Sequence, residues 1–194
     1  RRAVRIRSGQ DDDEFVAALS KAASAMKLGN PLDLGTQIGA VNSEVQLAGN
    51  LGFVEDARRD GGDVVLGGNR AMTETGGYYM EPTVVAGVQP SHRLFREEVF
   101  GPVLAVTPFQ TEAEAVNLAN ATDFGLAAGV WTSNLSRAHR MVRAIKSGVV
   151  HVNTYGGSDN TVPLGGMKQS GNGHDKSLHA LDKYTELKTA WIQL

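Results

Sequence analysis

Residues 103–109 read Val-Leu-Ala-Val-Thr-Pro-Phe, an apolar and partly β-branched run that predicts a buried strand. Residues 111–114, Thr-Glu-Ala-Glu, follow at once and form a capping box, which predicts that a helix begins there. The elements expected next are a strand at 127–132, a helix at 136–146 and a last buried strand at 149–152. Such alternation is typical of a mainly parallel sheet covered by helices, so the sequence predicts an α/β fold.

Two further helices are expected before this stretch, and each of the three main helices should turn one apolar face inward. The expected inward residues are Phe15, Leu19, Ala22, Ala23 and Met26 in residues 12–26; Val45, Ala48, Leu51 and Val54 or Glu55 in residues 43–60; and Met141, Val142 and Ile145 in residues 136–146. Strands are also expected at 63–66 and 79–88. Pro82 interrupts the second of these, which predicts an edge strand or an irregular one.

Length and composition exclude several classes of protein. The chain has 194 residues and a formal net charge of 19 − 21 = −2, which fits one domain or one and a fraction. The apolar share of 41% and charged share of 21% are ordinary for a globular protein and exclude a disordered one. There is no basic excess that would favour nucleic acid or anionic lipid, and no run near the roughly 20 apolar residues that span a bilayer. We therefore expect a cytoplasmic protein without nucleic-acid or membrane partners.

The residues that bind metals or act as nucleophiles are sparse. Cysteine is absent, which excludes disulfides, zinc–thiolate sites and a cysteine nucleophile on this chain. Of the five histidines only His174 and His179 are close in sequence, and a five-residue step does not place both on one helical face. The sequence therefore predicts no metal site.

Two segments are candidates for a functional site. Residues 97–103, Glu-Glu-Val-Phe-Gly-Pro-Val, are either a solvated acidic turn or a carboxylate held at a strand entrance, where it can accept hydrogen bonds from a sugar diol. Residues 153–168 follow a buried strand and are polar and rich in glycine, which predicts unusual backbone geometry. This second segment is either a flexible connector or a ligand site, since ligands bind at the carboxyl ends of parallel strands.

The C-terminal residues 184–194, Tyr-Thr-Glu-Leu-Lys-Thr-Ala-Trp-Ile-Gln-Leu, alternate polar and apolar side chains like a half-exposed strand. No strand nearby in sequence offers it a partner. A lone terminal strand of this kind usually adds to another sheet, often on another subunit.

Together these segments resemble the aldehyde dehydrogenase superfamily over about residues 12–194. The matching motifs are Glu97–Val103 (EEVFGPV), 29–33 (GNPLD), 79–83 (YMEPT), 125–128 (GLAA), 149–153 (VVHVN), 165–171 (GGMKQSG) and 184–189 (YTELKT). Residues 135–141, 169–173 and 175–181 resemble more specifically the branch that oxidises γ-glutamyl-γ-aminobutyraldehyde in putrescine breakdown. The first eleven or so residues match the family poorly.

The resemblance implies that the chain is a C-terminal fragment: residues 1–169 would be a partial catalytic domain and residues 170–194 a linker and oligomerisation strand. In the family a cysteine thiolate attacks the aldehyde, hydride passes to the nicotinamide, and water activated by a glutamate hydrolyses the thioester. The cysteine, the glutamate base, the oxyanion-hole asparagine and most of the dinucleotide-binding domain lie upstream of the matching region. We therefore expect no catalytic residue on this chain and no activity from the chain alone.

The resemblance also assigns binding roles. Glu98 matches the residue that holds the nicotinamide ribose hydroxyls, Phe100 the aromatic beside that ribose, and Leu126 an apolar neighbour of the nicotinamide. The residues on the loop that lines the aldehyde tunnel are Ser158, Asp159 and Leu164. Many relatives have aromatics at the first and last of these positions, which predicts a wider tunnel here.

The implied cofactor is NAD or NADP, bound mostly by the missing N-terminal half, and the implied partners are an aldehyde and further copies of the chain. The alternative is a non-catalytic module that only oligomerises or binds partners. Glu98 and Phe100 favour the enzyme, because a pure interaction module has no need of ribose contacts.

Overall fold

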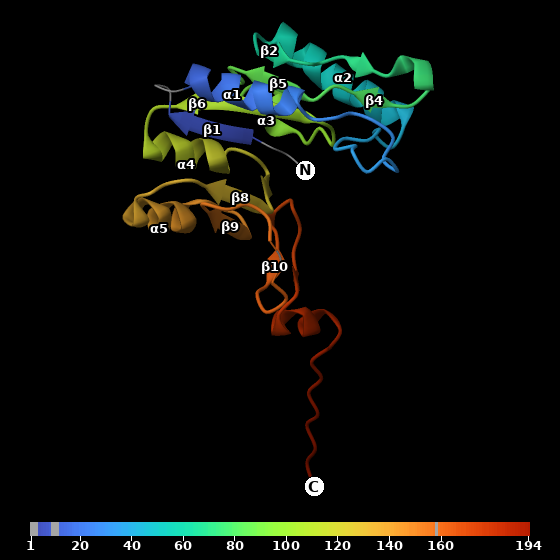
Figure 1. Ribbon diagram of the computed structural model, residues 1–194. Helices are drawn as coiled ribbons and strands as arrows, with labels where there is room; N and C mark the ends of the chain where they lie inside the picture. The colour runs from blue at the N-terminus through green and yellow to red at the C-terminus, as the bar shows by residue number, and fades with distance from the viewer. Residues whose placement is uncertain (1–3, 9–11, 158) are drawn as a thin grey trace. The chain divides into compact units, whose positions relative to one another are not determined.

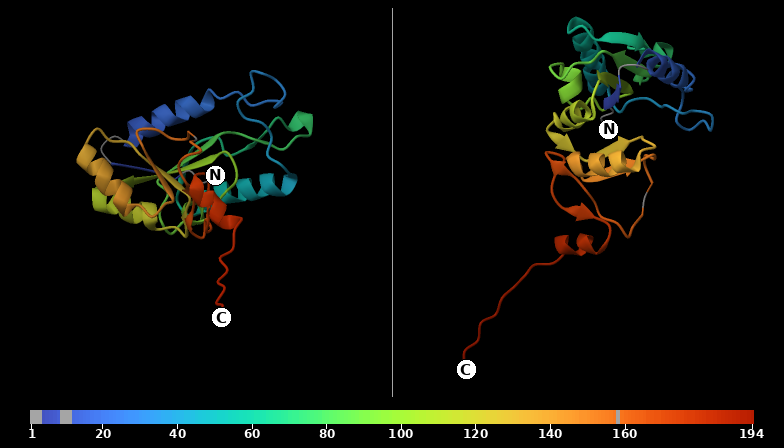
Figure 2. Two further views of the ribbon diagram at one scale, coloured as in Figure 1. Left: turned by 90° about the horizontal axis from the view of Figure 1, so that it is seen from below. Right: turned by 90° about the vertical axis from the view of Figure 1, so that its left-hand side faces the viewer.

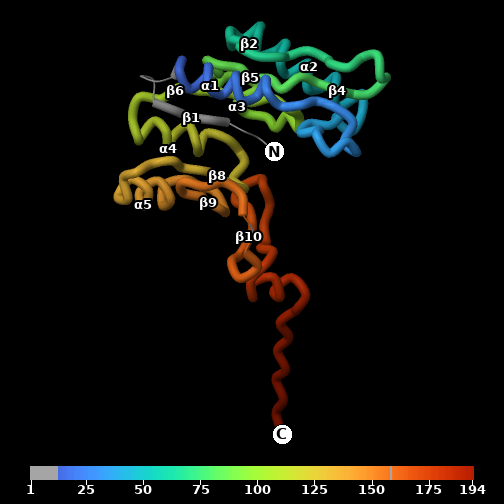
Figure 3. The backbone as a smooth tube through the Cα atoms, viewed as in Figure 1, coloured from blue at the N-terminus to red at the C-terminus, as the bar shows by residue number. Residues whose placement is uncertain are grey.

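The computed structural model describes residues 4–8, 12–157 and 159–194. Contacts within the chain divide it into two compact units, Arg1–Ala121 and Thr122–Leu194, which we describe separately. Figure 1 labels most of their elements, and Figure 3 traces the same path as a tube. The expected division into residues 1–169 and 170–194 concerns function and stays a prediction.

The first unit is built on a four-stranded sheet with the order β1-β6-β5-β2. Its strands are β1 Val4–Ser8, β2 Asp63–Leu66, β5 Thr83–Ala86 and β6 Val103–Phe109. β6 pairs in parallel with β1 and with β5, whereas β2 pairs antiparallel with β5. Two shorter strands, β3 Arg70–Ala71 and β4 Tyr79–Met80, pair with each other. A mainly parallel sheet is thus confirmed.

Helices cover both faces of this sheet. They are α1 Asp12–Ser24, α2 Glu44–Arg59, the single turn α3 Arg93–Arg96 and α4 Glu112–Asn120, with a 3-10 turn at Thr73–Thr75. The left view of Figure 2 shows α1 on one face of the sheet and α2 with α4 on the other. The capping box is confirmed: Thr111 Oγ1 accepts from Glu114 N at 3.1 Å, and the Glu114 carboxylate accepts from Gln110 N at 2.7 Å.

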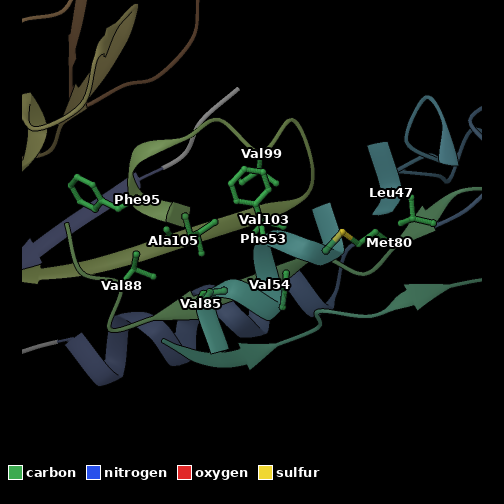
Figure 4. Close-up of a cluster of buried hydrophobic side chains, with 12 residues drawn as sticks. Leu47, Phe53, Val54, Met80, Val85, Val88, Phe95, Val99, Val103 and Ala105 are labelled. Carbon is green, nitrogen blue, oxygen red and sulfur yellow. The ribbon is translucent and has the colours of Figure 1, made fainter. Parts of the chain in front are cut away.

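The core of the first unit lies between α2, α3 and one face of the sheet (Figure 4). Alternate sheet residues face this cluster, among them Val85, Val103 and Ala105. Val84 and Val106 lie outside the cluster yet are 1% and 0% exposed, so the opposite face of the sheet is buried as well. Burial on both faces explains why these strands read as nearly continuous apolar runs.

The predicted inward faces of the helices need correction. In α2 Val54 is buried as predicted and Leu51 is half-buried, but Val45 is 82% exposed and Ala48 is exposed. The buried face also holds Leu47, Asn50, Phe53 and Ala57. In α5 (Leu135–Ala144) Met141 is buried as predicted, and so is Ile145 directly after the helix, but Val142 is 40% exposed. In α1 the predicted face is only half-buried, Ala22 is exposed, and Met26 lies beyond the end of the helix with 46% exposure. These helices carry apolar residues on more than one side, so spacing alone did not select the buried side.

Two predictions about strands also change. The stretch 79–88 is irregular, because Pro82 separates β4 from β5, but its edge-strand alternative is wrong: β5 lies between β6 and β2. The strand β1 was not predicted at all. Its backbone pairs with β6 from Val4 opposite Ala105 to Ser8 opposite Phe109.

The second unit holds shorter elements. They are β7 Phe124–Gly125, β8 Ala127–Val130, α5 Leu135–Ala144, β9 Val149–Val152, β10 Leu164–Gly165, β11 Met167–Lys168, β12 His174–Asp175 and a 3-10 helix at Leu178–Lys183. β8 and β9 pair in parallel, while β10 pairs with β12 and β11 with β7, both antiparallel. Residues 185–194 form no helix or strand.

Among the residues that the structure describes, none of the helices combines the length and the apolar character that crossing a bilayer would need. The cytoplasmic location stays a prediction.

Candidate functional site

The acidic turn lies between α3 and β6 in the first unit and alternates buried and exposed side chains. Glu98 is half-buried, Val99 is 7% exposed and packs in the core, and Phe100 is 63% exposed. Phe100 has a φ of 55°, in the left-handed region that favours glycine. The backbone therefore buries Val99 and turns the next ring outward.

Side chains of helix α2 contact the backbone of this turn. Gln46 Nε2 donates to Val99 O at 2.9 Å, across 53 positions of sequence. The Asn50 side chain is fully buried and lies against Gly101, where a Cβ would overlap its amide. Only glycine fits at that position while the amide is in place.

A charged contact ties the entrance of the turn to the same helix. Arg93 Nη1 donates to Asp56 Oδ2 at 3.0 Å, and Arg93 Nε donates to Glu97 Oε2 at 2.9 Å. The guanidinium also lies over the Phe53 ring, 3.9 Å from its centroid. The hydrogen bonds that Arg93 and, to a smaller extent, Arg59 donate to Asp56 lower the pKa of its carboxyl. In turn, the hydrogen bonds to the carboxylates of Asp56 and Glu97 raise the pKa of Arg93.

The exit of the turn is anchored to the sheet. Val103 N donates to Gly101 O at 2.8 Å, and Thr83 N donates to Pro102 O at 2.8 Å. The turn is thus fixed at both ends and also by its contacts with α2. This geometry favours the interpretation of a held carboxylate over that of a solvated loop.

Sequence reasoning missed the three residues of this support, Gln46, Asn50 and Arg93. A signal for Asn50 was present: it stands three residues after Leu47 and three before Phe53, so it shares their helical face. A polar residue inside an apolar stripe indicates a buried hydrogen-bonding role.

In the second unit two of the recognised motifs lie side by side. Gly125 N donates to Ser170 Oγ at 3.0 Å, and the β7–β11 pair sets Met167 opposite Gly125. Lys168 Nζ donates to Thr122 O at 2.8 Å. Leu126, which follows directly, is 51% exposed, so this packing fixes the backbone of an exposed apolar side chain.

Two hydrogen bonds of Asn153 fix the start of the glycine-rich loop, residues 153–168. Asn153, with a φ of 54°, accepts from Thr132 N at 2.8 Å and donates to Thr132 O at 2.9 Å through its side-chain amide. Gly156 and Gly157 follow with φ of 86° and 92°, which confirms the expected unusual backbone. Ser158 lies outside the described residues.

Asp159 binds its own loop. Its Oδ1 accepts from Thr161 N at 2.8 Å and from Thr161 Oγ1 at 2.7 Å, the pattern of an Asx turn. These two hydrogen bonds, backbone first, lower the pKa of this exposed carboxyl, with a further contribution from Lys176. Leu164 lies in β10 opposite Asp175 and is 39% exposed.

Of the predicted site residues, the structure thus brings Glu98 and Phe100 together in one turn of the first unit. Leu126, Asp159 and Leu164 belong to the second unit. Within residues 4–8, 12–157 and 159–194, no group of three or more His, Asp or Glu side chains is arranged to hold a metal ion.

Comparisons with known proteins identify the family. The model of the aldehyde dehydrogenase family matches residues 8–190. NADP/NAD-dependent aldehyde dehydrogenase PuuC of Escherichia coli (strain K12) is 47% identical over 182 residues, which cover 94% of this chain and 36% of PuuC. A betaine aldehyde dehydrogenase of Cereibacter sphaeroides is 44% identical over 180 residues, which cover 93% of this chain and 37% of that protein.

Solved structures match equally well. Indole-3-acetaldehyde dehydrogenase AldA of P. syringae, in complex with NAD⁺ and IAA, has a TM-score of 0.94 at 48% identity, covering 99% of this chain and 39% of that one. Aldehyde dehydrogenase KauB of Pseudomonas aeruginosa has a TM-score of 0.94 at 49% identity, with the same coverage. The chain spans little more than a third of the length of the curated relatives it matches. It belongs to the aldehyde dehydrogenase family.

Proposed function

We propose that this chain is part of an NAD- or NADP-dependent aldehyde dehydrogenase, in which it supplies the turn that contacts the nicotinamide ribose and part of the aldehyde-binding surface. The observation that carries the proposal is the anchored turn around Glu98. Its neighbour Val99 is held in the core, and its other neighbour Glu97 is bonded to Arg93. A carboxylate in so fixed a backbone is suited to a ligand of defined geometry.

The residues present fit a nicotinamide ribose. A carboxylate offers acceptor atoms to both hydroxyls of a diol, and hydrogen bonds to a charged acceptor are roughly twice as strong as neutral ones. The outward ring of Phe100 offers an apolar face beside them. When bound, the nicotinamide supplies the acceptor for hydride, and Glu98 and Phe100 would hold its ribose in place.

We propose an aminoaldehyde as substrate, with γ-glutamyl-γ-aminobutyraldehyde from putrescine breakdown as the first candidate. Residues 135–141, 169–173 and 175–181 resemble the branch that acts on it, and relatives include PuuC and betaine aldehyde dehydrogenases. The carboxylate of Asp159, on the loop assigned to the aldehyde entrance, would attract the ammonium end of such a substrate.

Substitution of Glu98 tests the proposed role of the turn in the full-length protein that carries this chain. Glu98→Gln keeps the shape and removes the charge, so the ribose is held less firmly. Because small misplacement of reacting groups can cost about a hundredfold, we expect single-turnover hydride transfer to slow by up to that factor. The KM for aldehyde should change less.

The neighbouring carboxylate provides a matched control. Glu97→Gln removes the same charge one position earlier, where the side chain is bonded to Arg93. Because the glutamine oxygen can still accept from Arg93, this anchor of the turn is weakened but kept, and hydride transfer should slow much less than in Glu98→Gln. An unchanged rate in Glu98→Gln would return Glu98 to the solvated-turn interpretation.

The chain by itself should have no dehydrogenase activity, because it contains no cysteine that could attack an aldehyde. NAD(P)H absorbance with purified chain, coenzyme and aldehyde measures this. Turnover above the buffer blank, in material free of host enzymes, would contradict the expectation.

For the C-terminal residues we propose pairing with a second copy of the chain, as the resemblance implies. Large apolar side chains there are strongly exposed: Leu187 at 103%, Trp191 at 92% and Ile192 at 79%. Light scattering of the chain with and without residues 185–194 tests this. A monomer in both cases, with freely exchanging amides in the tail, would mean that the tail does not associate.

A further inference from the structure

Asn50 is a polar side chain in an apolar position. It is 0% exposed, and its neighbours on the inner face of α2 are Leu47, Phe53 and Val54. Burying an amide is costly unless it is hydrogen-bonded, so an apolar residue would fill this place at a lower cost. The retained amide therefore has a contact that an apolar residue could not make.

The contacts of Asn50 lead to the acidic turn. The Asn50 side-chain amide lies 2.7 Å from Gln46 Nε2, which itself donates to Val99 O at 2.9 Å. In the orientation that gives both atoms of the Asn50 amide a partner, its nitrogen also donates to Val99 O at 2.7 Å, so Asn50 reaches the turn directly and through Gln46. On the other side, the Asn50 amide fills the space that a Cβ of Gly101 would take. The two side-chain amides of α2 thus contact the backbone immediately before and after Phe100.

Phe100 needs such support. Its φ of 55° is unfavourable for a residue with a Cβ, and such a conformation persists only where the surroundings determine it. Val99 is fixed by its buried side chain and by Gln46, and Gly101 is fixed by contact with Asn50. The direction of the Phe100 ring follows from the placement of these two neighbours, and so does that of the Glu98 carboxylate.

We propose that Asn50 is a positioning residue for the coenzyme: together with Gln46 it sets the backbone at Val99 and Gly101, and through it the placement of Glu98 and Phe100 on the nicotinamide ribose. This inference rests on the proposed function of the turn. It assigns Asn50 no contact with coenzyme or substrate.

The test uses three variants of the full-length protein. Asn50→Leu keeps the branched shape and the number of heavy atoms and removes the amide. Gln46→Met keeps the length of a half-buried side chain and removes the donor to Val99 O, so it decides the matter if Asn50→Leu does not fold. Val54→Ala is the control, since Val54 is a fully buried residue of the same helix whose substitution loosens the core. Each variant is measured for Tm, for the Kd of NAD⁺, for single-turnover hydride transfer and for the KM of the aldehyde.

We expect Asn50→Leu and Gln46→Met to slow hydride transfer by about tenfold or more and to weaken NAD⁺ binding, with less than about a threefold change in the aldehyde KM. Val54→Ala should lower the Tm and leave the kinetics near wild type. If both amide variants behave like Val54→Ala, Asn50 is merely structural and the inference is wrong. If Glu98→Gln has no effect either, the proposed function of the turn fails; if it slows transfer as expected, only the role of Asn50 fails.

Discussion

The acidic turn and the glycine-rich loop are both candidates from sequence, but they are held in different ways. Val99 is bonded to Gln46, 53 positions away, and the Arg93 side chain next to the turn is bonded to Asp56, 37 positions away. In the loop, Asp159 is hydrogen-bonded to Thr161, two positions away, although the loop backbone is also tied to distant residues, for example where Ser177 N donates to Asn160 O. The two candidates therefore differ at the functional side chain: distant side chains fix the backbone next to Glu98, whereas the Asp159 carboxylate is engaged within its own loop.

The largest effect on stability is expected where the turn meets α2. Gly101→Ala places a methyl group on the buried amide of Asn50, and overpacking of this kind typically costs about 1–3 kcal/mol. Asn50→Ala in the same protein vacates that space, so the double variant should lose less stability than the sum of the two single ones. Urea unfolding followed by far-ultraviolet circular dichroism measures this. Both tryptophans, Trp131 and Trp191, lie in Thr122–Leu194, so their fluorescence reports only the other unit.

Glycines elsewhere provide the controls. Gly49, inside α2, has open space around its Cβ position, so Gly49→Ala should stabilise by about 0.5–1 kcal/mol. Gly157 also has open space but a φ of 92°, so Gly157→Ala should destabilise through strain alone, and Asn50→Ala should not relieve it. Strict additivity of Gly101→Ala and Asn50→Ala would contradict the contact.

The same contrast explains what could be predicted from sequence. The strand Val103–Phe109, its capping box and the positive φ of Gly156 and Gly157 depend on neighbouring residues, and all were predicted correctly. The buried face of α2 was predicted only in part: Val54 is buried as expected, but Asn50 was not assigned to that face because it is polar. Its burial depends on Gly101, whose position next to α2 is set only by the folded sheet.

The strand Val4–Ser8 and the location of β5 failed for a related reason. Which strands pair is determined by the whole sheet, and β5 lies inside it although Pro82 precedes it. The resemblance to a family supplied candidate site residues that local patterns could not. Glu98 by itself is indistinguishable from any acidic residue in a turn.

An effect of intermediate size on the free energy of unfolding is expected when the pH is lowered. The pKa of Asp56 in the folded chain lies below its ordinary value of 3.8, because Arg93 and Arg59 donate to the carboxylate. Such a group contributes stability above the unfolded pKa, and this contribution is lost as the pH falls through the folded pKa. The free energy of unfolding of the wild type should therefore decrease as the pH falls below about 4, and that of Asp56→Asn should decrease less.

A second carboxyl, that of Asp175, allows the acid response of the second unit to be distinguished from that of the first. The pKa of Asp175 is lowered by its contact with Lys183 in the second unit. Asp175→Asn should therefore reduce the acid sensitivity of hydrogen exchange in that unit and leave the first unit unchanged, whereas Asp56→Asn should do the reverse. Equal pH dependence in the wild type and in Asp56→Asn would show that the link from Arg93 to α2 contributes nothing.

The smallest effect is expected from substitution of Asp159, where the charge can be removed without loss of the hydrogen bonds. An asparagine keeps an Oδ1 that can accept from Thr161, so Asp159→Asn removes the charge while the loop keeps its two hydrogen bonds. Because the pKa of Asp159 is lowered, the wild-type carboxylate is charged at neutral pH and can attract an ammonium group.

In the full-length protein we expect the KM for aminoaldehydes to rise by roughly two- to fivefold in Asp159→Asn, since exposed ion pairs are weak. The KM for uncharged aldehydes of equal length should not change, and the difference should shrink as salt is added. Asp159→Ala, which also removes the hydrogen bonds to Thr161, should affect both substrate classes. An equal rise for both classes in Asp159→Asn would leave Asp159 as the residue that caps its own loop, and the proposed preference for aminoaldehydes would need a basis elsewhere in the protein.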